Sequence, residues 1–564
     1  MAVGSNYPSV QPSLSLDFAN GQILDSRISF TRGSTGAYYP GTSVLAEQNL
    51  FTYSQNLAQN APWGANGVTV SGTLITAPDG TTTANQLIYS SGGATQNLRY
   101  TFNFQAGVTY TISVYLLAIS GDTSFTFDLQ NSETSSVYTA TASWQRVVYT
   151  VTPASARTWV DFQLGATGTI GLWGAQLEQR SSATAYNATT TSALTNYIPQ
   201  LLTAPINQPR FDHDPVLGTS LGLLIEQSST NLFTNSNGFG LSIYNWSILN
   251  TTPTTYNTNI APDGTQTATH LTLTNGTSYN ANDTSGTYGS FVFTASTTYT
   301  WSVYAKAGEL SYLMFRNNWT GVNPIFNLAT GVVTQGSGTS SMTPVGNGWY
   351  RCVCVYAVTS GNNNISFRPY ALSGTSNGYD GIYIWGAQLE ALAFPTSYIP
   401  TTTSTVTRSA DSALISGTNF SNWFNPTQGT VYAESTPSLV SANSPLYAFT
   451  DSTVTNSNTI YANQYTGNHL VVRIGNSTVV NLTSGTYVDK ISTKYAGSYK
   501  INNFGVVLNG GTVSTNTSAN LPIVDRFFIG GNSSGTTAGV QWIKKISYYQ
   551  QALTSAQIQT LTSY

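Results

Sequence analysis

The sequence predicts an all-β protein made of tandem antiparallel β-sandwiches, with one short helix near the end of the chain. Short runs such as Thr109–Tyr115 alternate β-branched and aromatic residues with polar ones, and clusters of Ser, Thr, Asn and Gly separate these runs. A period of two is typical of strands with one buried face, and many such runs between turn clusters favour sandwiches over a parallel sheet. The helix is predicted at residues 553–561, where a Thr or Ser cap accompanies apolar residues at helical spacing.

The composition indicates a folded chain with unusually little charge. At roughly 100–200 residues per domain, a length of 564 residues suggests several folded units. Charged residues make up 7% of the chain, against about 25% in ordinary domains, whereas hydrophobic residues reach 40% and aromatic residues 12%. Disorder is therefore excluded as the main state. With a net charge of −3, no basic stripe and no long apolar run, neither nucleic acid binding nor membrane insertion is expected.

A long stretch of the sequence occurs twice. The six residues Trp-Gly-Ala-Gln-Leu-Glu that start at Trp173 are repeated letter for letter from Trp385. Other motifs recur in the same order: Asn49–Phe51 as Asn231–Phe233, Ala77–Gly80 as Ala261–Gly264, Tyr110–Tyr115 as Tyr299–Tyr304, Phe127–Leu129 as Phe326–Leu328, Trp144–Arg146 as Trp349–Arg351, and Tyr197–Pro199 as Tyr398–Pro400. Each copy is long enough to bury its own core, so we interpret them as tandem domains rather than solenoid units.

The repeat divides the chain into six parts. We expect an N-terminal anchor or connector at 1–48, a first module at 49–200, a docked connector at 201–230, a second module at 231–400, a linker at 401–428 and a third, unrelated sandwich at 429–564. The second copy carries extra residues between the same predicted strands. Loops accept such insertions, and binding surfaces commonly lie there.

The repeated motifs resemble a known family. The residues that carry the resemblance are Arg210–Pro215, Gly222–Glu226, Thr230–Leu232, Ala261–Gly264, Gly348–Arg351 and Trp385–Glu390. Together they look like the modules of tailed-phage head-spike, fibre and related virion surface proteins, over about residues 14–411. The resemblance implies jelly-roll folds similar to carbohydrate-binding modules, and residues 429–564 separately resemble a concanavalin or laminin-G type sandwich.

The resemblance also implies a function. It predicts a non-enzymatic virion surface protein, a head spike, fibre or capsid decoration, that is made in the host cytoplasm. Such a protein attaches to capsid or tail proteins, with the N-terminal segment as the expected anchor, and presents glycan-adhesive sandwiches to host surface glycans. A homo-oligomer, with a trimer favoured, follows from the same resemblance and agrees with the weakly charged composition.

Two alternatives remain open at this point. A tail fibre or receptor-binding protein would use the same modules at another place on the particle. A polysaccharide depolymerase would need two opposed carboxylates in one cleft. The histidines, His213, His270 and His469, are far apart in the sequence and lie in no nucleophile-base or zinc spacing, so catalysis is not expected.

Glycan binding is predicted in segments that differ between the copies. Trp319, with its neighbours Asn317 and Asn318, lies in a polar stretch that has no aligned partner, and Tyr379 with Asp380 forms a second candidate. An aromatic face with amide neighbours suits the apolar and hydroxyl sides of a sugar ring.

The shared tryptophans Trp173 and Trp385 are predicted to pack rather than to bind sugar. Strict alternation along residues 382–389 would place Trp385 on one face together with Tyr383, Ala387 and Leu389.

No cofactor is expected to be required, but a structural calcium ion is one hypothesis. Jelly rolls of this kind often hold such an ion, and the resemblance names four candidate ligands: Glu47, Glu178, Glu226 and Glu390. Glu178 and Glu390 end the repeated tryptophan motifs, and Glu47 and Glu226 lie near the opening segments of the two copies.

Overall fold

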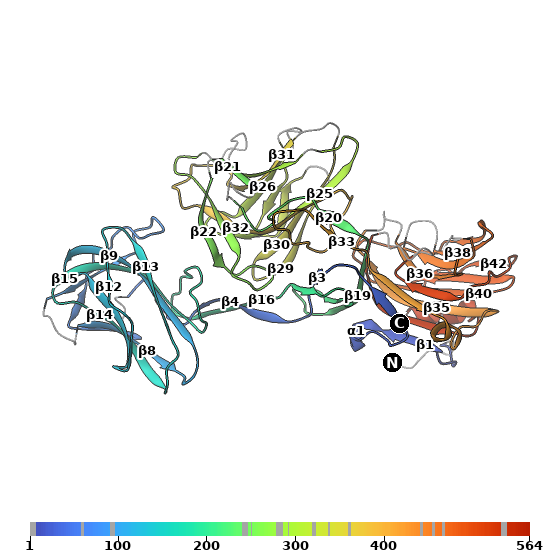
Figure 1. Cartoon of the computed structure of the whole chain (residues 1–564), viewed down its shortest axis with the longest axis horizontal. Helices are drawn as coiled ribbons and strands as arrows, with labels where there is room; N and C mark the ends of the chain where they lie inside the picture. The colour runs from blue at the N-terminus through green and yellow to red at the C-terminus, as the bar shows by residue number, and fades with distance from the viewer. Residues whose placement is uncertain are drawn as a thin grey trace.

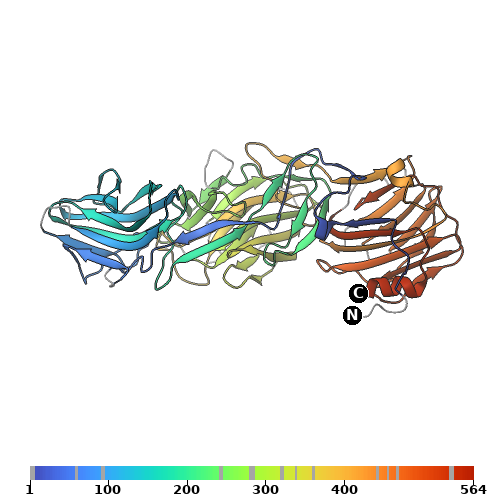
Figure 2. The same ribbon diagram turned by 90° about the horizontal axis from the view of Figure 1, so that it is seen from below.

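The computed structural model describes residues 7–57, 61–90, 96–239, 246–249, 251–277, 286–291, 293–317, 323–336, 339–358, 363–439, 444–453, 457–464, 469–531 and 539–563. Three β-sandwiches follow one another along an elongated molecule, as Figure 1 and the perpendicular view in Figure 2 show. The all-β prediction is confirmed. No helix in the described part of the chain is long and apolar enough to cross a membrane.

The first sandwich packs two sheets around a core of its own. The β8 sheet runs in the order β11 (Glu133–Thr134), β10 (Ser124–Leu129), β14 (Arg157–Leu164), β8 (Asn97–Phe104) and β5 (Trp63–Asn66), with β12 (Tyr138–Thr139) beside β10. The β9 sheet runs in the order β13 (Gln145–Val151), β9 (Tyr110–Gly121), β15 (Gly168–Glu178), β7 (Asn85–Tyr89) and β6 (Val68–Val70). Alternate residues such as Val160, Phe162 and Leu164 on β14 point into this core, as the period of two predicts.

The second sandwich repeats the first. Its β31 sheet holds β21 (Trp246–Leu249), β24 (Gly286–Phe291), β31 (Asn363–Tyr370), β26 (Tyr312–Asn317), β27 (Ile325–Asn327) and β28 (Val332–Gln335). Its β32 sheet holds β22 (Thr251–Asn259), β23 (Ala268–Leu273), β32 (Gly381–Glu390), β25 (Thr298–Ala307), β30 (Trp349–Ala357) and β29 (Thr339–Gly346). Phe315 on β26 lies opposite Phe367 on β31, as Phe127 on β10 lies opposite Phe162 on β14. Phe127 therefore corresponds to Phe315, and the predicted match with Phe326 is wrong.

The third sandwich contains distant parts of the chain. Its β35 sheet holds β18 (Phe211–His213), β19 (Ser220–Glu226), β44 (Val540–Tyr549), β35 (Gln428–Pro437), β40 (Thr493–Lys500), β41 (Asn503–Leu508) and β42 (Ser514–Asn516), with β1 (Leu14–Asp17) beside β44. Its β36 sheet holds β2 (Ser29–Thr31), β34 (Ser412–Ser416), β43 (Arg526–Ile529), β36 (Pro445–Thr450), β37 (Thr459–Asn463), β38 (Leu470–Ile474) and β39 (Ser477–Leu482). The predicted terminal helix is α3 (Ser555–Ser563), and two single-turn helices that were not predicted are α1 (Phe18–Gly21) and α2 (Thr418–Ser421).

The predicted domain boundaries differ from this arrangement. Residues 1–48, 201–230 and 401–428 were expected to be an anchor, a connector and a linker, but each contributes strands or a helix to the third sandwich. Leu14 pairs with Tyr548, for example. The first and second sandwiches are therefore insertions into the third.

Two-stranded stems carry the inserted sandwiches. The first stem pairs β3 (Gly36–Tyr38) with β17 (Leu202–Ala204) and β4 (Ser43–Asn49) with β16 (Leu194–Pro199). The second stem pairs β20 (Ser229–Asn231) with β33 (Val406–Arg408). Figure 1 shows the first stem running from the third sandwich to the first sandwich, alongside the second sandwich.

A buried ion-pair network joins the four chain crossings between the third sandwich and the stems. Its members, called the junction network below, are Arg32, Arg210, Glu226, Arg408 and Asp411. Arg210 lies 2.6 Å from Glu226 and 2.5 Å from Asp411, and these three side chains are fully buried. Arg32 pairs with Asp411 at 3.1 Å, and Arg408 lies 3.5 Å from Glu226.

The charges in the junction network depend on each other. Burial alone raises the pKa of Glu226, but the charges of Arg408 and Arg210 and the hydrogen bonds from Ser397 lower this pKa to about 2. Burial lowers the pKa of Arg210, but Asp411 and Glu226 more than offset this effect and raise it. Because a buried ion is costly without its partner, the network favours one arrangement of the chain crossings.

The repeated motif holds the opening segment of each sandwich to β15 or β32. Asn49 Nδ2 donates to the carbonyl oxygens of Ala175 and Asn187, and its Oδ1 accepts from the backbone of Phe51 and Leu177. In the second sandwich Asn231 makes the same four contacts, with Ala387, Ile399, Phe233 and Leu389. Asn187 is thus equivalent to Ile399, so Tyr186 corresponds to Tyr398. The predicted match of Tyr197 with Tyr398 is wrong, because Tyr197 lies on the first stem.

The shared tryptophans are buried, as predicted. The residues that share a strand face with Trp385, however, differ from the prediction. Trp173 is 4% exposed and Trp385 is 1% exposed. Ile384, Ala387 and Leu389 all belong to the core of the second sandwich, whereas Trp385 packs on the opposite face of β32. A bulge with a φ of +65° at Gly386 interrupts the alternation, which a strict period of two does not foresee.

Candidate functional site

The predicted glycan residues fall partly outside the described structure. Trp319 and Asn318 lie outside the described residues, and Asn317 is the last residue of β26. Tyr379 is 49% exposed, but a Cβ added at Gly80 of the first sandwich would lie 3.5 Å from its ring. Asp380 accepts a hydrogen bond from the backbone of Asn377 within its own loop. Tyr379 thus lies where the first two sandwiches meet, and a sugar contact there stays a prediction.

The four glutamates of the calcium hypothesis have protein partners. Glu178 and Glu390 are fully buried, and each accepts two hydrogen bonds from one threonine, Thr184 or Thr396. Glu226 belongs to the junction network, and Glu47 pairs with Lys306. Among the described residues no group of three or more His, Cys, Asp or Glu side chains could hold a metal ion. The structure therefore does not gather these glutamates as the hypothesis requires.

The outer face of the β8 sheet is the best candidate for a glycan site. Along β14, Val160, Phe162 and Leu164 enter the core, so Trp159 and Asp161 point to the opposite face. Cross-strand pairing sets Asp161 opposite Arg99 on β8, and Trp159 opposite Thr101. The site forms because alternation from Trp159 to Leu164 presents an aromatic and a charged residue on one face.

Hydrogen bonds fix the side chains on this face. Arg99 binds both oxygens of Asp161, at 2.7 and 2.8 Å, and its guanidinium carbon lies 4.2 Å from the centre of the Trp159 ring. The hydrogen bond to Asp161 raises the pKa of Arg99, so this residue remains charged. The indole Nε1 of Trp159 is buried and has no hydrogen-bond partner among the described residues. The aromatic ring is thus held in place before any ligand arrives.

Two carboxylates lie side by side beneath this surface. Asp128 on β10 is the cross-strand neighbour of Asp161, and the exposed fractions of the two residues are 2% and 1%. Burial and the charge of Asp161 raise the pKa of Asp128, whose Oδ2 accepts a hydrogen bond of 2.8 Å from Gln163. Since both carboxylates are buried and hydrogen-bonded, they support the surface instead of facing a substrate.

A hollow adjoins this face at the edge of the sheet. It has a volume of about 640 Å³ and is lined by Ala61, Pro62, Trp63, Gly64, Arg99 and Thr101. Arg99 and Thr101 thus belong both to the hollow and to the face that carries Trp159. We call Arg99, Thr101, Trp159, Asp161, Gln163 and this hollow the Trp159 surface.

The second sandwich does not repeat the Trp159 surface. When the core residues Phe162 and Phe367 are matched, Asp161 corresponds to Ser366 and Gln163 to Arg368. This surface lies where the two copies differ, but it contains none of the residues predicted from the sequence to bind glycans. The signal was present in residues 157–164, where Trp, Asp and Gln alternate with core residues.

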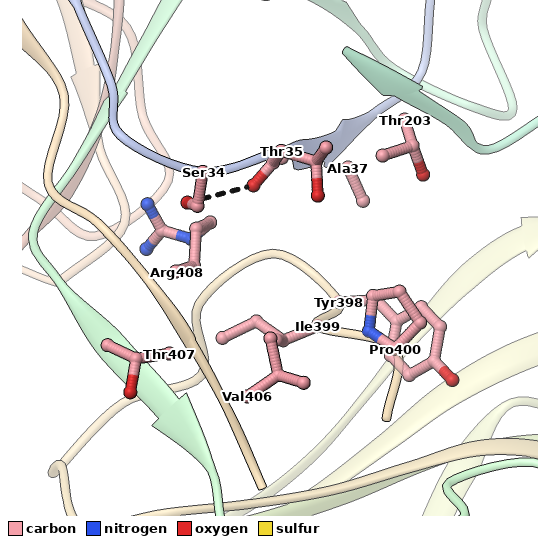
Figure 3. A pocket seen from close by; sticks show the side chains of 11 residues that line it. Ser34, Thr35, Ala37, Thr203, Tyr398, Ile399, Pro400, Val406, Thr407 and Arg408 are labelled. Atoms are coloured by element: carbon pink, nitrogen blue, oxygen red, sulfur yellow. Dashed lines mark hydrogen bonds between the residues drawn. The ribbon is translucent and has the colours of Figure 1, made fainter. Parts of the chain in front are cut away.

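A small pocket near the junction network offers no room for a ligand. It is lined by residues of β3, β17, β33 and the segment 398–400, as Figure 3 shows. Its volume is about 30 Å³, which is comparable to the share of a single water molecule. The pocket is a packing gap between the two stems.

The chain resembles known proteins only at low sequence identity. No protein-family model matches the chain, and no curated protein sequence matches it. Among solved structures, the chain is similar to the tandem CBM22 domains of Xyn10C from Paenibacillus barcinonensis, with 13% identity, coverage of 63% of this chain and 98% of that one, and a TM-score of 0.20. It is similar to the CBM40 of the Ruminococcus gnavus IT-sialidase, with 16% identity, coverage of 24% and 84%, and a TM-score of 0.21. For the Trypanosoma rangeli sialidase the identity is 11%, the coverage 98% and 97%, and the TM-score 0.21.

Proposed function

We propose that this protein is a non-enzymatic surface protein of a tailed-phage virion that binds host surface glycans through its β-sandwiches. It would serve as a head spike, fibre or capsid decoration. The observation that carries the binding function is the Trp159 surface, where an aromatic ring is held by a bidentate Arg99–Asp161 pair beside an open hollow. A rigid aromatic face flanked by polar groups suits a sugar ring.

The architecture supports a role in adhesion. The inserted sandwiches are carried on two-stranded stems, and the junction network holds the chain crossings at the base of these stems. A virion location rests on the resemblance of the repeated motifs. We further propose that copies of the chain associate, with a trimer favoured, which light scattering of the purified chain will test.

Particle imaging tests the virion proposal. An antibody raised against the chain should label purified phage particles at the capsid. Labelling confined to the tail would favour the tail-fibre alternative, and the absence of the chain from purified particles would contradict the proposal.

A glycan array and a cleavage assay test the molecular activity. The full chain should bind host-derived glycans and leave their polymer length unchanged. Shortened polymers would support the depolymerase alternative. Absence of binding to every host glycan and to host cells would contradict the adhesive function.

A further inference from the structure

A second cavity lies where the first stem and the second and third sandwiches meet. Its volume is about 280 Å³. Tyr39 lines it from the first stem, Asp212 from the β18–β19 hairpin, Arg351 from β30, and Lys490 and Trp542 from the third sandwich. The cavity is therefore complete only when these parts of the chain are assembled.

Two cations in this cavity have no carboxylate partner. Neither Arg351 nor Lys490 forms an ion pair within 4.0 Å with any described residue. Partial burial and the charge of Arg351 lower the pKa of Lys490, an effect that the nearby Asp489 partly opposes. Only 7% of the residues are charged, yet the wall of this cavity carries these two cations together with the carboxylates Asp212, Asp214 and Glu226.

The repeat explains only part of the environment of Arg351. Its counterpart Arg146 lies over a tyrosine ring at 5.6 Å and donates to Ser113, and Arg351 lies over Tyr304 at 5.7 Å and donates to Ser302. Arg146 also donates to the carbonyl oxygen of a threonine at 2.5 Å. Arg351 makes no such bond in the described residues, although the equivalent threonine lines the same cavity. The Arg351 guanidinium therefore lacks one hydrogen bond that the Arg146 guanidinium makes, and it can donate to a ligand oxygen in that place.

The carboxylates that line the cavity already accept hydrogen bonds. Asp212 accepts from the indole Nε1 of Trp542 at 2.7 Å and from the backbone of Tyr39 at 2.7 Å. Glu226 is held by Arg210, and Asp214 accepts two backbone hydrogen bonds within its own turn. Glu226 pairs with Arg210 and Arg408, and among the described residues none of these three carboxylates forms an ion pair with Arg351 or Lys490.

We propose that this cavity binds one acidic sugar residue, with its carboxylate between Arg351 and Lys490 and its ring beside Trp542. Guanidinium and ammonium groups recognise a carboxylate, and aromatic walls cover the apolar face of a sugar ring. This inference rests on the proposed glycan-binding function and specifies its ligand class. The site is distinct from the Trp159 surface.

Calorimetry on the full chain tests the proposal. Glucuronate, galacturonate and N-acetylneuraminate serve as acidic probes, glucose as the neutral counterpart, and acetate as a carboxylate without a ring. At least one acidic sugar should bind at low salt, at least tenfold more tightly than glucose or acetate, and its affinity should fall as salt is added.

Three variants locate the binding site. Arg351→Gln and Lys490→Gln should each weaken the acidic sugar at least tenfold, because each removes one cation. Arg146→Gln is the matched control, since it changes the same position of the repeat outside the cavity, and its affinity should equal that of the wild type. Melting temperatures of all three variants show whether each one folds.

The possible outcomes separate this inference from the proposed function. The inference is overturned if none of the acidic sugars binds, or if folded Arg351→Gln and Lys490→Gln variants bind as the wild type does. If array glycans still bind the wild type and lose affinity in a Trp159→Ala variant, the adhesive function stands without this cavity. If acidic sugars bind only through Arg351 and Lys490 and the Trp159→Ala variant is unaffected, the inference stands and the Trp159 surface is the wrong site.

Discussion

Replacing Asp411 by Asn should strongly destabilise the protein through the junction network. Asp411 is fully buried, and its two oxygens bind Arg32 at 3.1 Å and Arg210 at 2.5 Å. It also accepts a hydrogen bond of 2.9 Å from the backbone of Glu226. An amide has no charge and a single acceptor oxygen, so three buried arginines would be left with one carboxylate. Removing one partner of a buried ion pair costs about 3–5 kcal/mol.

Differential scanning calorimetry measures this loss. At roughly 2–4 °C per kcal/mol for a unit of this size, the transition of the third sandwich should fall by about 6–20 °C. Asp525→Asn is the control, because the Arg526–Asp525 pair is partly exposed and such pairs contribute at most about 1 kcal/mol. A transition for Asp411→Asn within 2 °C of the wild type would refute the reasoning that the network holds the chain crossings together.

Three further changes test other parts of the structure. Asn231→Ala removes four buried hydrogen bonds and should lower the free energy of unfolding in urea by on the order of 3 kcal/mol; an unchanged value would mean that the opening segment does not need this residue. Gly386→Ala should destabilise by about 1–3 kcal/mol in the same assay, because its φ is +65° and its Cβ would lie 3.1 Å from the Tyr304 ring. In the control Gly72→Ala the new Cβ meets no atom within 4 Å, and an equal loss there would contradict the role of the bulge. Burial raises the pKa of Asp212 to about 6 despite its hydrogen bonds from Trp542 and Tyr39. Because this folded-state pKa lies above the unfolded value of about 3.9, Asp212 contributes stability below about pH 4, and this stability is lost as the pH rises through 6. The Asp212→Asn variant should therefore show a melting temperature that changes less between about pH 4 and about pH 6 than that of the wild type. An unchanged pH profile of the melting temperature would show that another group controls it.

The sequence predicts the type of fold well because period-two patterns are local. Alternation identifies strands such as β9 and β32, and the duplicated motifs identify the first two sandwiches. Partners far apart in the sequence carry no local signal. The pairing of Leu14 with Tyr548 is an example, so the contribution of residues 1–48 to the third sandwich was not foreseen.

The candidate site was harder to predict than the fold. The bulge at Gly386 shifts the alternation along β32, so a strict period of two wrongly grouped Trp385 with Ala387 and Leu389. The glycan residues predicted from the sequence lie in segments of the second copy, whereas the Trp159 surface lies on β8 and β14 of the first. Arg99 reaches Trp159 only because β8 and β14 are neighbours, and the sequence does not specify that pairing.

The affinity of the full chain and of its Trp159→Ala variant for an array-selected glycan tests the central claim most directly. The account predicts at least a tenfold loss of affinity, because the ring beside Arg99 would be gone, with a melting temperature close to that of the wild type. Equal affinity in the folded variant would contradict the claim that this surface binds host glycans.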